Sequence, residues 1–447
     1  MLLFTMIAGV VMAQNGVNSP YSRYGFGLLS DQSTSANKGM GGLSYGLRNK
    51  YQINVGNPAS YSAIDSLTFL FDAGITLQNA NFDNGSIKMN TKNSSLDYLA
   101  FQFRMFKNIG MTAGFLPYSK INYSFSSSEK VREDEEGTVY SYESFAGDGG
   151  LNQAFLGVGG EVFKGFSIGA NVSYLWGDLN HTIKNSYSSS TVWSILRSYT
   201  SEIKTYKADF GIQYSKTFNT KHMVTVGATY SLGHNVKADA YKIQQSLDES
   251  SGSSSVMTQR IDTIANAYQI PHCFGIGFTY VYDKRLTVGM DYTLQKWANV
   301  KYPHFTTKPK EDGNTNLPAE LIEHTTGSNV DYENWKFNNS YKLAIGMEYV
   351  PSFTARSIFK RMRYRLGGYY SDPYVKVKGA DTREYGIGGA VVVPIFNTHS
   401  SKTSFLTVSA EYVNVNPKVN NLIKENYLKL SVGLTFGELW FLKWKVQ

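Results

Sequence analysis

The chain has 447 residues, a formal net charge of +8, a charged fraction of 17% and an aromatic fraction of 14%. The charged fraction lies below the roughly 25% usual for soluble domains, yet a mean hydropathy of -0.28 is too polar for a bundle of membrane helices. These values favour an all-β transmembrane barrel, whose strands turn one face to lipid and the other to a polar lumen.

The single cysteine, Cys273, excludes an intramolecular disulfide and a cysteine-based metal cluster, and we expect it to be a small buried residue of a strand. Seven histidines are scattered without metal-ligand spacing. The net positive charge is not accompanied by a basic helix or a nucleic-acid motif, so we expect no nucleic acid as a partner. Outer-membrane lipid and lipopolysaccharide carry phosphate groups that would attract this positive charge, and we expect them as partners.

Residues 1–13 are apolar and end in Ala13, which predicts a secretory signal peptide with cleavage after that residue. The alternative is a short buried strand. No later stretch has about 18 apolar residues without charge, so we expect no transmembrane helix. Residues 14–66 are rich in Gly, Ser and Asn with little alternation, and we interpret them as a folded hatch, or plug, inside the barrel.

From Leu67 to residue 437 the hydrophobic pattern has the period of two that is typical of strands. The clearest alternating segments are residues 206–215, 224–232, 286–295, 341–349 and 428–436. Their polar faces carry mainly Gly, Ser, Thr, Asn and Gln, which fits a crowded barrel interior better than the water-exposed face of a soluble sandwich. The segments predict an antiparallel barrel of about fourteen strands, an even number as bacterial barrels require.

The predicted connections alternate in length, as expected when short turns face the periplasm and long loops face the outside. The short ones are Lys107–Asn108, Lys164–Gly165, Phe218–Lys221 and Asp283–Lys284; the long ones are residues 128–150, 185–197, 247–256 and 300–335. A basic stretch from Arg356 to Arg365 is predicted at a periplasmic turn, where it contacts phosphates, binds an acidic partner or is simply solvated. Residues 438–447 form an aromatic and basic tail that we expect in the periplasm, at the inner membrane interface.

Three groups of residues resemble one family. Lys38–Gly42 followed by Asn57–Ser60 resembles the Gly-rich stretch and Asn-Pro-Ala turn in the hatch of FadL-type long-chain fatty-acid transporters. Gly110–Lys120, with its internal proline, is similar to the kinked third strand of that family. The segments Ser19–Gly25 and Gly433–Lys443 look like the ends of FadL-like proteins of the Bacteroidota.

The resemblance implies that the hatch residues Gly39, Gly41, Gly42, Asn57, Pro58 and Ala59 block the lumen. It also implies a lateral gate at Pro117 and Tyr118, through which an apolar ligand leaves sideways into the membrane. A proline removes a ladder hydrogen bond wherever it lies in a strand. The alternative to a gate is therefore a bulge without function.

A Gly-x-Ser-x-Gly match at Gly42–Gly46 lacks the strand, the helix and the downstream partners that a serine hydrolase needs, so we expect no enzyme. We also expect no cofactor and no metal. The leading hypothesis is a FadL-like channel of the cell outer membrane for a fatty acid or another hydrophobic molecule. The alternative is a non-enzymatic barrel subunit of an outer-membrane protein assembly or secretion complex, with other outer-membrane proteins as partners.

Overall fold

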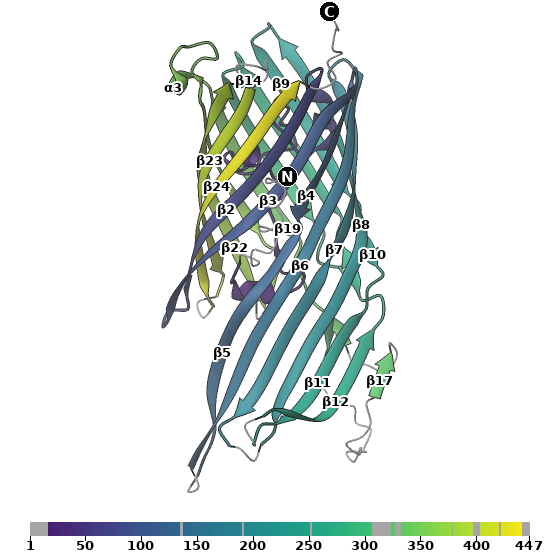
Figure 1. The fold of residues 1–447 in the computed structure, drawn as a ribbon, viewed down its shortest axis with the longest axis vertical. Helices are drawn as coiled ribbons and strands as arrows, with labels where there is room; N and C mark the ends of the chain where they lie inside the picture. Colours follow the sequence, from purple (N-terminus) through teal and green to yellow (C-terminus); the bar gives the residue numbers. More distant parts are fainter. Residues whose placement is uncertain are drawn as a thin grey trace, which may run out of the picture.

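The computed structural model describes residues 17–134, 137–189, 192–250, 253–305, 323–326, 332–377, 379–396, 403–419 and 422–439. The predicted signal peptide and most of the predicted C-terminal tail lie outside these residues. The all-β prediction is confirmed, because the described chain folds as a closed antiparallel barrel (Figure 1). Among the described residues, no helix combines the length and the apolar character needed to cross a bilayer.

Fourteen of the described strands form the closed wall, which agrees with the predicted number. In order around the barrel they are β2 (Thr68–Asp83), β3 (Lys88–Phe106), β4 (Ile109–Pro117), β6 (Gly137–Phe163), β7 (Phe166–Tyr187), β8 (Ser194–Phe218), β9 (His222–Ser231), β14 (Cys273–Tyr282), β15 (Leu286–Gln295), β19 (Ser340–Tyr349), β20 (Arg363–Asp372), β22 (Ala380–Phe396), β23 (Thr403–Pro417) and β24 (Lys424–Leu439). The wall closes where β2 pairs with β24, from Thr68 opposite Leu439 to Asp83 opposite Lys424.

The remaining described elements lie inside the wall or at its ends. The N-terminal segment, residues 17–66, contains η1 (Pro20–Arg23), β1 (Leu28–Leu29), α2 (Ser35–Lys38) and η2 (Pro58–Ala63). The others are β5 (Ser119–Asp134), β10 (His234–Val236), β11 (Ala240–Asp248), β12 (Ser255–Ile264), β13 (Tyr268–Ile270), β16 (Pro303–Phe305), β17 (Glu323–Thr326), β18 (Tyr332–Asn334), β21 (Lys376–Val377) and α3 (Ile358–Arg361).

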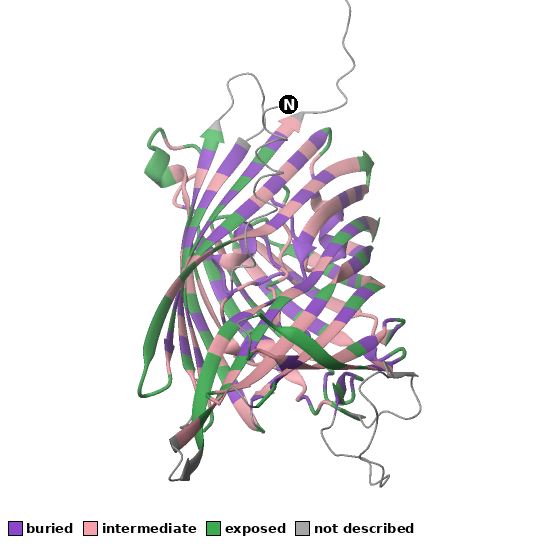
Figure 2. Ribbon diagram, turned by 60° about the horizontal axis from the view of Figure 1, so that its bottom comes forward, coloured by how far each residue is buried: buried purple, intermediate pink, exposed green. Residues whose placement is uncertain are grey.

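The outward face of the wall is apolar, as the alternating pattern predicts. On β19, Ile345 is 52% exposed while its neighbour Ala344 is buried, and on β24 Leu430 is 47% exposed while Ser431 is buried. Burial therefore alternates residue by residue along the strands (Figure 2). Side chains that are both apolar and exposed over a whole barrel indicate a surface that lipid covers.

The four short connections predicted from the sequence are all found, and they lie at the end of the barrel where β24 finishes. The loop predicted at residues 247–256 is found, since β11 ends at Asp248 and β12 begins at Ser255. The loop predicted at residues 128–150 is wrong, because most of these residues lie in the hairpin β5–β6. Their polar residues suit water-exposed strands equally well, because cross-strand pairing extends β6, β7 and β8 beyond the other wall strands (Figure 1). Most of the connection 300–335 lies outside the described residues.

The basic stretch Arg356–Arg365 is not a single turn. Arg363 and Arg365 belong to β20, and the side chain of Arg365 is buried inside the barrel. The prediction of a turn holds only for the residues up to α3. The sequence could not separate the arginines of the turn from those of β20. Arg365 faces inward and pairs with the carboxylate of Glu348, a residue of another strand.

Candidate functional site

The N-terminal segment lies within the barrel, against the inward face of the wall. Glycines on successive strands make this close approach possible. A Cβ atom placed on any of them would overlap backbone or side-chain atoms of the segment. These wall glycines are Gly110, Gly159, Gly169, Gly211, Gly227, Gly346, Gly367 and Gly433.

The residues predicted for the hatch take part in this packing. Gly39 and Gly41 contact the wall at Ala390 and Gly368, where a Cβ atom would not fit. Gly41 and Gly42 have φ angles of 70° and 84°, in the left-handed region that glycine adopts at little cost. These glycines therefore allow the chain to turn while touching β20 and β22.

The Asn-Pro-Ala turn begins η2 and anchors it to the wall. The Asn57 side chain accepts a hydrogen bond from the Ala59 N–H at 3.1 Å, which caps the 3-10 helix, and Pro58 follows at the first helical position. The Asn57 amide donates to the carbonyl oxygens of Tyr45 at 2.8 Å and of Ile212 at 3.2 Å. Asn57 thus joins two parts of the segment to β8.

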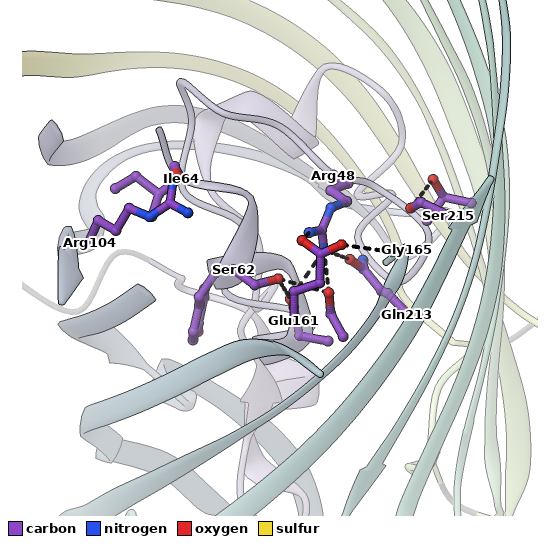
Figure 3. A network of polar contacts seen from close by, with 12 residues as sticks. Arg48, Ser62, Ile64, Arg104, Glu161, Gly165, Gln213 and Ser215 are labelled. Atoms are coloured by element: carbon purple, nitrogen blue, oxygen red, sulfur yellow. Dashed lines mark hydrogen bonds and ion pairs between the residues drawn. The ribbon is translucent and has the colours of Figure 1, made fainter. Parts of the chain in front are cut away.

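Arg48 forms a second anchor in the same region (Figure 3). Its guanidinium donates to Ser167 Oγ at 3.0 Å on β7 and lies 4.0 Å from the carboxylate of Glu161 on β6. Burial lowers the pKa of Arg48, and Glu161 opposes that effect. Gln213 of β8 donates to the Tyr45 carbonyl oxygen at 2.9 Å, so three wall strands hold this part of the segment.

Two buried charges on other strands also hold the segment. Arg365 pairs with Glu348 at 2.6 Å and donates to the Ala36 carbonyl oxygen and to Gln52, each at 2.6 Å. Asp291 of β15 accepts hydrogen bonds from the backbone N–H groups of Ser44 at 2.6 Å and Tyr45 at 2.8 Å. The sequence analysis missed these anchors, because nothing local marks which inward charges meet backbone groups.

Ser44 lies in a run of turns and bends rather than between a strand and a helix. The Gly42–Gly46 match therefore has no nucleophile-elbow context. Within the described ranges no group of His, Cys, Asp and Glu residues could hold a metal ion. Cys273 begins β14, and it lines a cavity where it is only half-buried, whereas the sequence predicted a buried strand residue.

The wall ladder is interrupted at Pro117. β4 pairs with β3 from Ile109 to Phe115, where Phe115 faces Leu99, and the pairing then stops. On its other side, β4 stays paired with β6 as far as Pro117. β5 continues this strand along β6 but has no ladder with β3, and the two strands diverge (Figure 1).

Residues of the N-terminal segment take up the hydrogen bonds that β3 leaves free. The Gln32 amide donates to the Pro117 carbonyl oxygen at 3.0 Å, and the Ser30 N–H donates to the Tyr118 carbonyl oxygen at 2.9 Å. β1 then pairs with the start of β5, with Leu29 opposite Ser119. We call residues 28–32 the closing segment. It was not predicted, because its residues show no strand pattern of their own.

Asn18 bridges the two diverging strands farther out. Its side chain donates to Asn93 of β3 at 3.0 Å and accepts from Asn122 of β5 at 3.0 Å. The gap between β3 and β5 is therefore bridged by polar contacts from inside the barrel.

A cavity of about 450 Å³ lies behind the closing segment and is lined by both predicted gate residues, Pro117 and Tyr118. Its lining near the kink includes the apolar side chains of Leu29, Leu116 and Phe155 together with polar ones. A cavity of this size next to an interrupted ladder can hold a small molecule.

Paired charges line the same cavity, and their carboxylates come from the elements at the kink, β3 and the closing segment. Lys38 lies 2.8 Å from Asp97, and Lys342 lies 3.6 Å from Asp31. Burial acts to raise the pKa of Asp31, but the ammonium groups of Lys342 and Lys38 bring it below its usual value. The cavity is thus lined by both apolar and ionic side chains close to the kink.

Aromatic side chains close the lumen at the end with the long hairpins. The ring of Phe26 is fully buried and lies 5.2 Å from that of Tyr302 and 5.9 Å from that of Trp297, measured between centroids. The hydroxyls of Tyr302 and Tyr374 donate to the carbonyl oxygens of Gly25 and Gly27, both at 2.7 Å. We call this group the aromatic seal.

The fold is shared with solved outer-membrane channels at low sequence identity. The CymD monoaromatic hydrocarbon channel is 12% identical, with a TM-score of 0.56 over 92% of this chain and 98% of that one. The Ralstonia pickettii toluene transporter TbuX is 12% identical, with a TM-score of 0.57 over 92% and 99%. A Pseudomonas aeruginosa FadL homologue is 10% identical, with a TM-score of 0.59 over 91% and 99%.

The expected likeness to FadL-type barrels is therefore confirmed for the fold. No curated protein matches the chain in sequence. The sequence profile of the BamG family, in contrast, matches residues 1–447. The chain belongs to the BamG family.

Proposed function

We propose that this protein is an outer-membrane channel that binds a hydrophobic small molecule in its central cavity and exchanges it sideways with the membrane at Pro117. The observation that carries this proposal is the interrupted ladder between β3 and β4, which lies directly beside the cavity. The solved channels with this fold are described as hydrocarbon and toluene transporters, and this supports a hydrophobic ligand.

A lateral route agrees with the obstruction of the lumen at both ends. Phe26 and its ring partners fill the outer end, and η2 packs against wall glycines toward the other end. Anchors such as Arg365 and Asp291 lie on different strands, so removing the whole segment would break many buried hydrogen bonds at once. Each buried polar group left without a partner costs about 1–3 kcal/mol. In our proposal the anchored part, residues 34–66, stays in place as a hatch.

The closing segment is the part that moves in this proposal. It is held by the hydrogen bonds of Ser30 and Gln32, by the short ladder between β1 and β5, and by the ion pair of Asp31 with Lys342. Its departure would join the cavity to the outer surface between β3 and β5. There the outward residues of β3 change from apolar Leu99 and Leu96 to polar Ser94 and Lys92, so the proposed opening would lie at the outer edge of the lipid-facing band.

Reversible disulfide locks test this proposal. Leu29→Cys with Ser119→Cys joins the closing segment to β5 at a pair of ladder partners. Ser62→Cys with Ser167→Cys joins the anchored part to β7, where the two hydroxyl oxygens are 3.0 Å apart. Both pairs are made with Cys273→Ala, and uptake of the dye N-phenylnaphthylamine is measured in cells with and without reductant.

We expect the lock at Leu29 and Ser119 to reduce dye uptake until reductant is added, and the lock at Ser62 and Ser167 to have no effect. Equal uptake with both locks closed would contradict a lateral route through the kink. Loss of uptake with the second lock alone would show that the anchored part moves instead. Mass spectrometry of lipid extracts from the purified protein should also detect a bound amphiphile.

Membership of the BamG family favours a second candidate function, a non-enzymatic subunit of an outer-membrane protein assembly or secretion complex. A firmly filled barrel also suits a scaffold, because binding a partner needs no open route. Affinity purification in mild detergent separates the two functions. Stoichiometric recovery of other barrels or lipoproteins supports the subunit, whereas a monomer that carries a bound amphiphile supports the channel.

A further inference from the structure

The connection between β19 and β20 differs from the other turns at its end of the barrel. The turns at Lys107–Asn108 and Lys164–Gly165 join their strands through two residues, and residues 283–285 join β14 to β15 through three. Residues 350–362 instead form a longer turn that contains α3 and projects from the side of the wall (Figures 1 and 2). It presents three exposed apolar side chains, those of Phe353, Ile358 and Phe359, and the last is 68% exposed.

The turn is folded against the lipid-facing side of the wall. Tyr364 lies on the outward face of β20, and its hydroxyl donates to the Phe359 carbonyl oxygen at 2.9 Å. The Ser352 N–H donates to the Lys360 carbonyl oxygen at 2.8 Å and closes the turn. The exposed apolar side chains therefore continue the surface that lipid covers.

Cations accompany these apolar residues. Arg356 and Lys360 are exposed within the turn. Lys164, Lys221 and Lys284 occupy short turns at the same end of the barrel. Aromatic and aliphatic side chains mixed with Lys and Arg are typical of segments that lie in a membrane interface and contact anionic headgroups.

We propose that residues 350–362 bind the inner leaflet of the outer membrane, with Phe353, Ile358 and Phe359 inserted among the lipids and Arg356 and Lys360 on anionic phospholipid headgroups. The occupant is the lipid leaflet rather than a protein, because the turn is continuous with the lipid-facing wall through Tyr364. The inference is independent of what the cavity binds. It assigns the turn a membrane-binding role that the proposed channel does not require.

Spin-label depth measurements test the proposal on the intact protein. A nitroxide is attached to Phe359→Cys or, as a matched control in a polar turn at the same end, to Thr220→Cys, each with Cys273→Ala. The protein is reconstituted in vesicles of phosphatidylethanolamine with phosphatidylglycerol, and collision of the label with oxygen is compared with collision with a water-soluble nickel chelate.

We expect the label at position 359 to collide more often with oxygen, which is concentrated in the lipid, and the label at position 220 to collide more often with the nickel chelate in water. Replacing phosphatidylglycerol by phosphatidylcholine, or introducing Arg356→Gln with Lys360→Gln, should shift the Phe359 label toward the chelate. A Phe359 label that behaves like the Thr220 label in all vesicles would overturn the proposal. So would a label that is shielded only when a co-purified protein is present, because the turn would then be a protein interface.

Discussion

The side-chain amide of Gln32 donates a 3.0 Å hydrogen bond to the carbonyl oxygen of Pro117, the last residue of β4. A residue of the N-terminal segment thus satisfies a backbone group at the point where the neighbouring wall strand departs. An unpaired backbone carbonyl is costly wherever water is absent. This contact explains how the interrupted ladder can exist at a buried position beside the cavity.

Gln32→Ala should loosen the closing segment without unfolding the barrel. A lost hydrogen bond of this kind is worth about 1 kcal/mol, which corresponds to roughly fivefold more frequent opening. Hydrogen–deuterium exchange should be faster at the Ser30 amide, which donates to Tyr118. The Tyr118 amide is an internal control, because it donates to Leu151 of β6. Equal acceleration at both amides would indicate general destabilisation instead.

Gly159→Ala should displace η2 from the wall, because a Cβ atom there would overlap the Pro58 carbonyl oxygen. Overpacking at such a site costs about 1–3 kcal/mol. Urea unfolding in detergent, followed by tryptophan fluorescence, should show a lower midpoint. The matched control is Gly160→Ala at the next position, where the nearest atom would be 3.6 Å away. If both variants were equally stable, the close packing of η2 against the wall would be wrong.

Arg365→Leu should be strongly destabilising, since it leaves the Glu348 carboxylate buried beside Arg363 alone and removes the donors to Ala36 and Gln52. Breaking a buried ion pair in this way costs about 3–5 kcal/mol. The free energy of unfolding measures the effect. Arg285→Leu serves as the control, because its pair with Asp283 is exposed and such pairs are worth about 1 kcal/mol or less.

Phe26→Ala should open the aromatic seal. Truncation leaves a void among the rings of Tyr268, Trp297 and Tyr302, which lie 5.2–5.9 Å from the Phe26 ring between centroids. We expect ion conductance in planar bilayers to rise above that of the unsubstituted protein. Phe278→Ala removes an equally large ring from the lipid-facing side of β14 and should leave the conductance unchanged. An unchanged conductance in Phe26→Ala would show that another group blocks the outer end.

The sequence alone predicts the wall of this protein. Alternation along residues 286–295 and 428–436 is a local property, and it specifies which side chains face lipid whichever strands become neighbours. The turn residues 283–284 are equally local, since they adopt positive φ angles between two such segments. Strand number, the short turns and the apolar outer surface therefore follow from the order of residues.

Only the tertiary structure decided how the interior is filled and where the wall is interrupted. Pro117 is visible in the sequence as a broken ladder position, but its partner Gln32 lies 85 residues away and carries no pattern of its own. Arg365 belongs to a basic stretch in the sequence and to a buried network with Ala36 in the fold. Both contacts arise because closing the barrel brings distant strands around one N-terminal segment, and periodicity within a strand contains no information about what it will enclose.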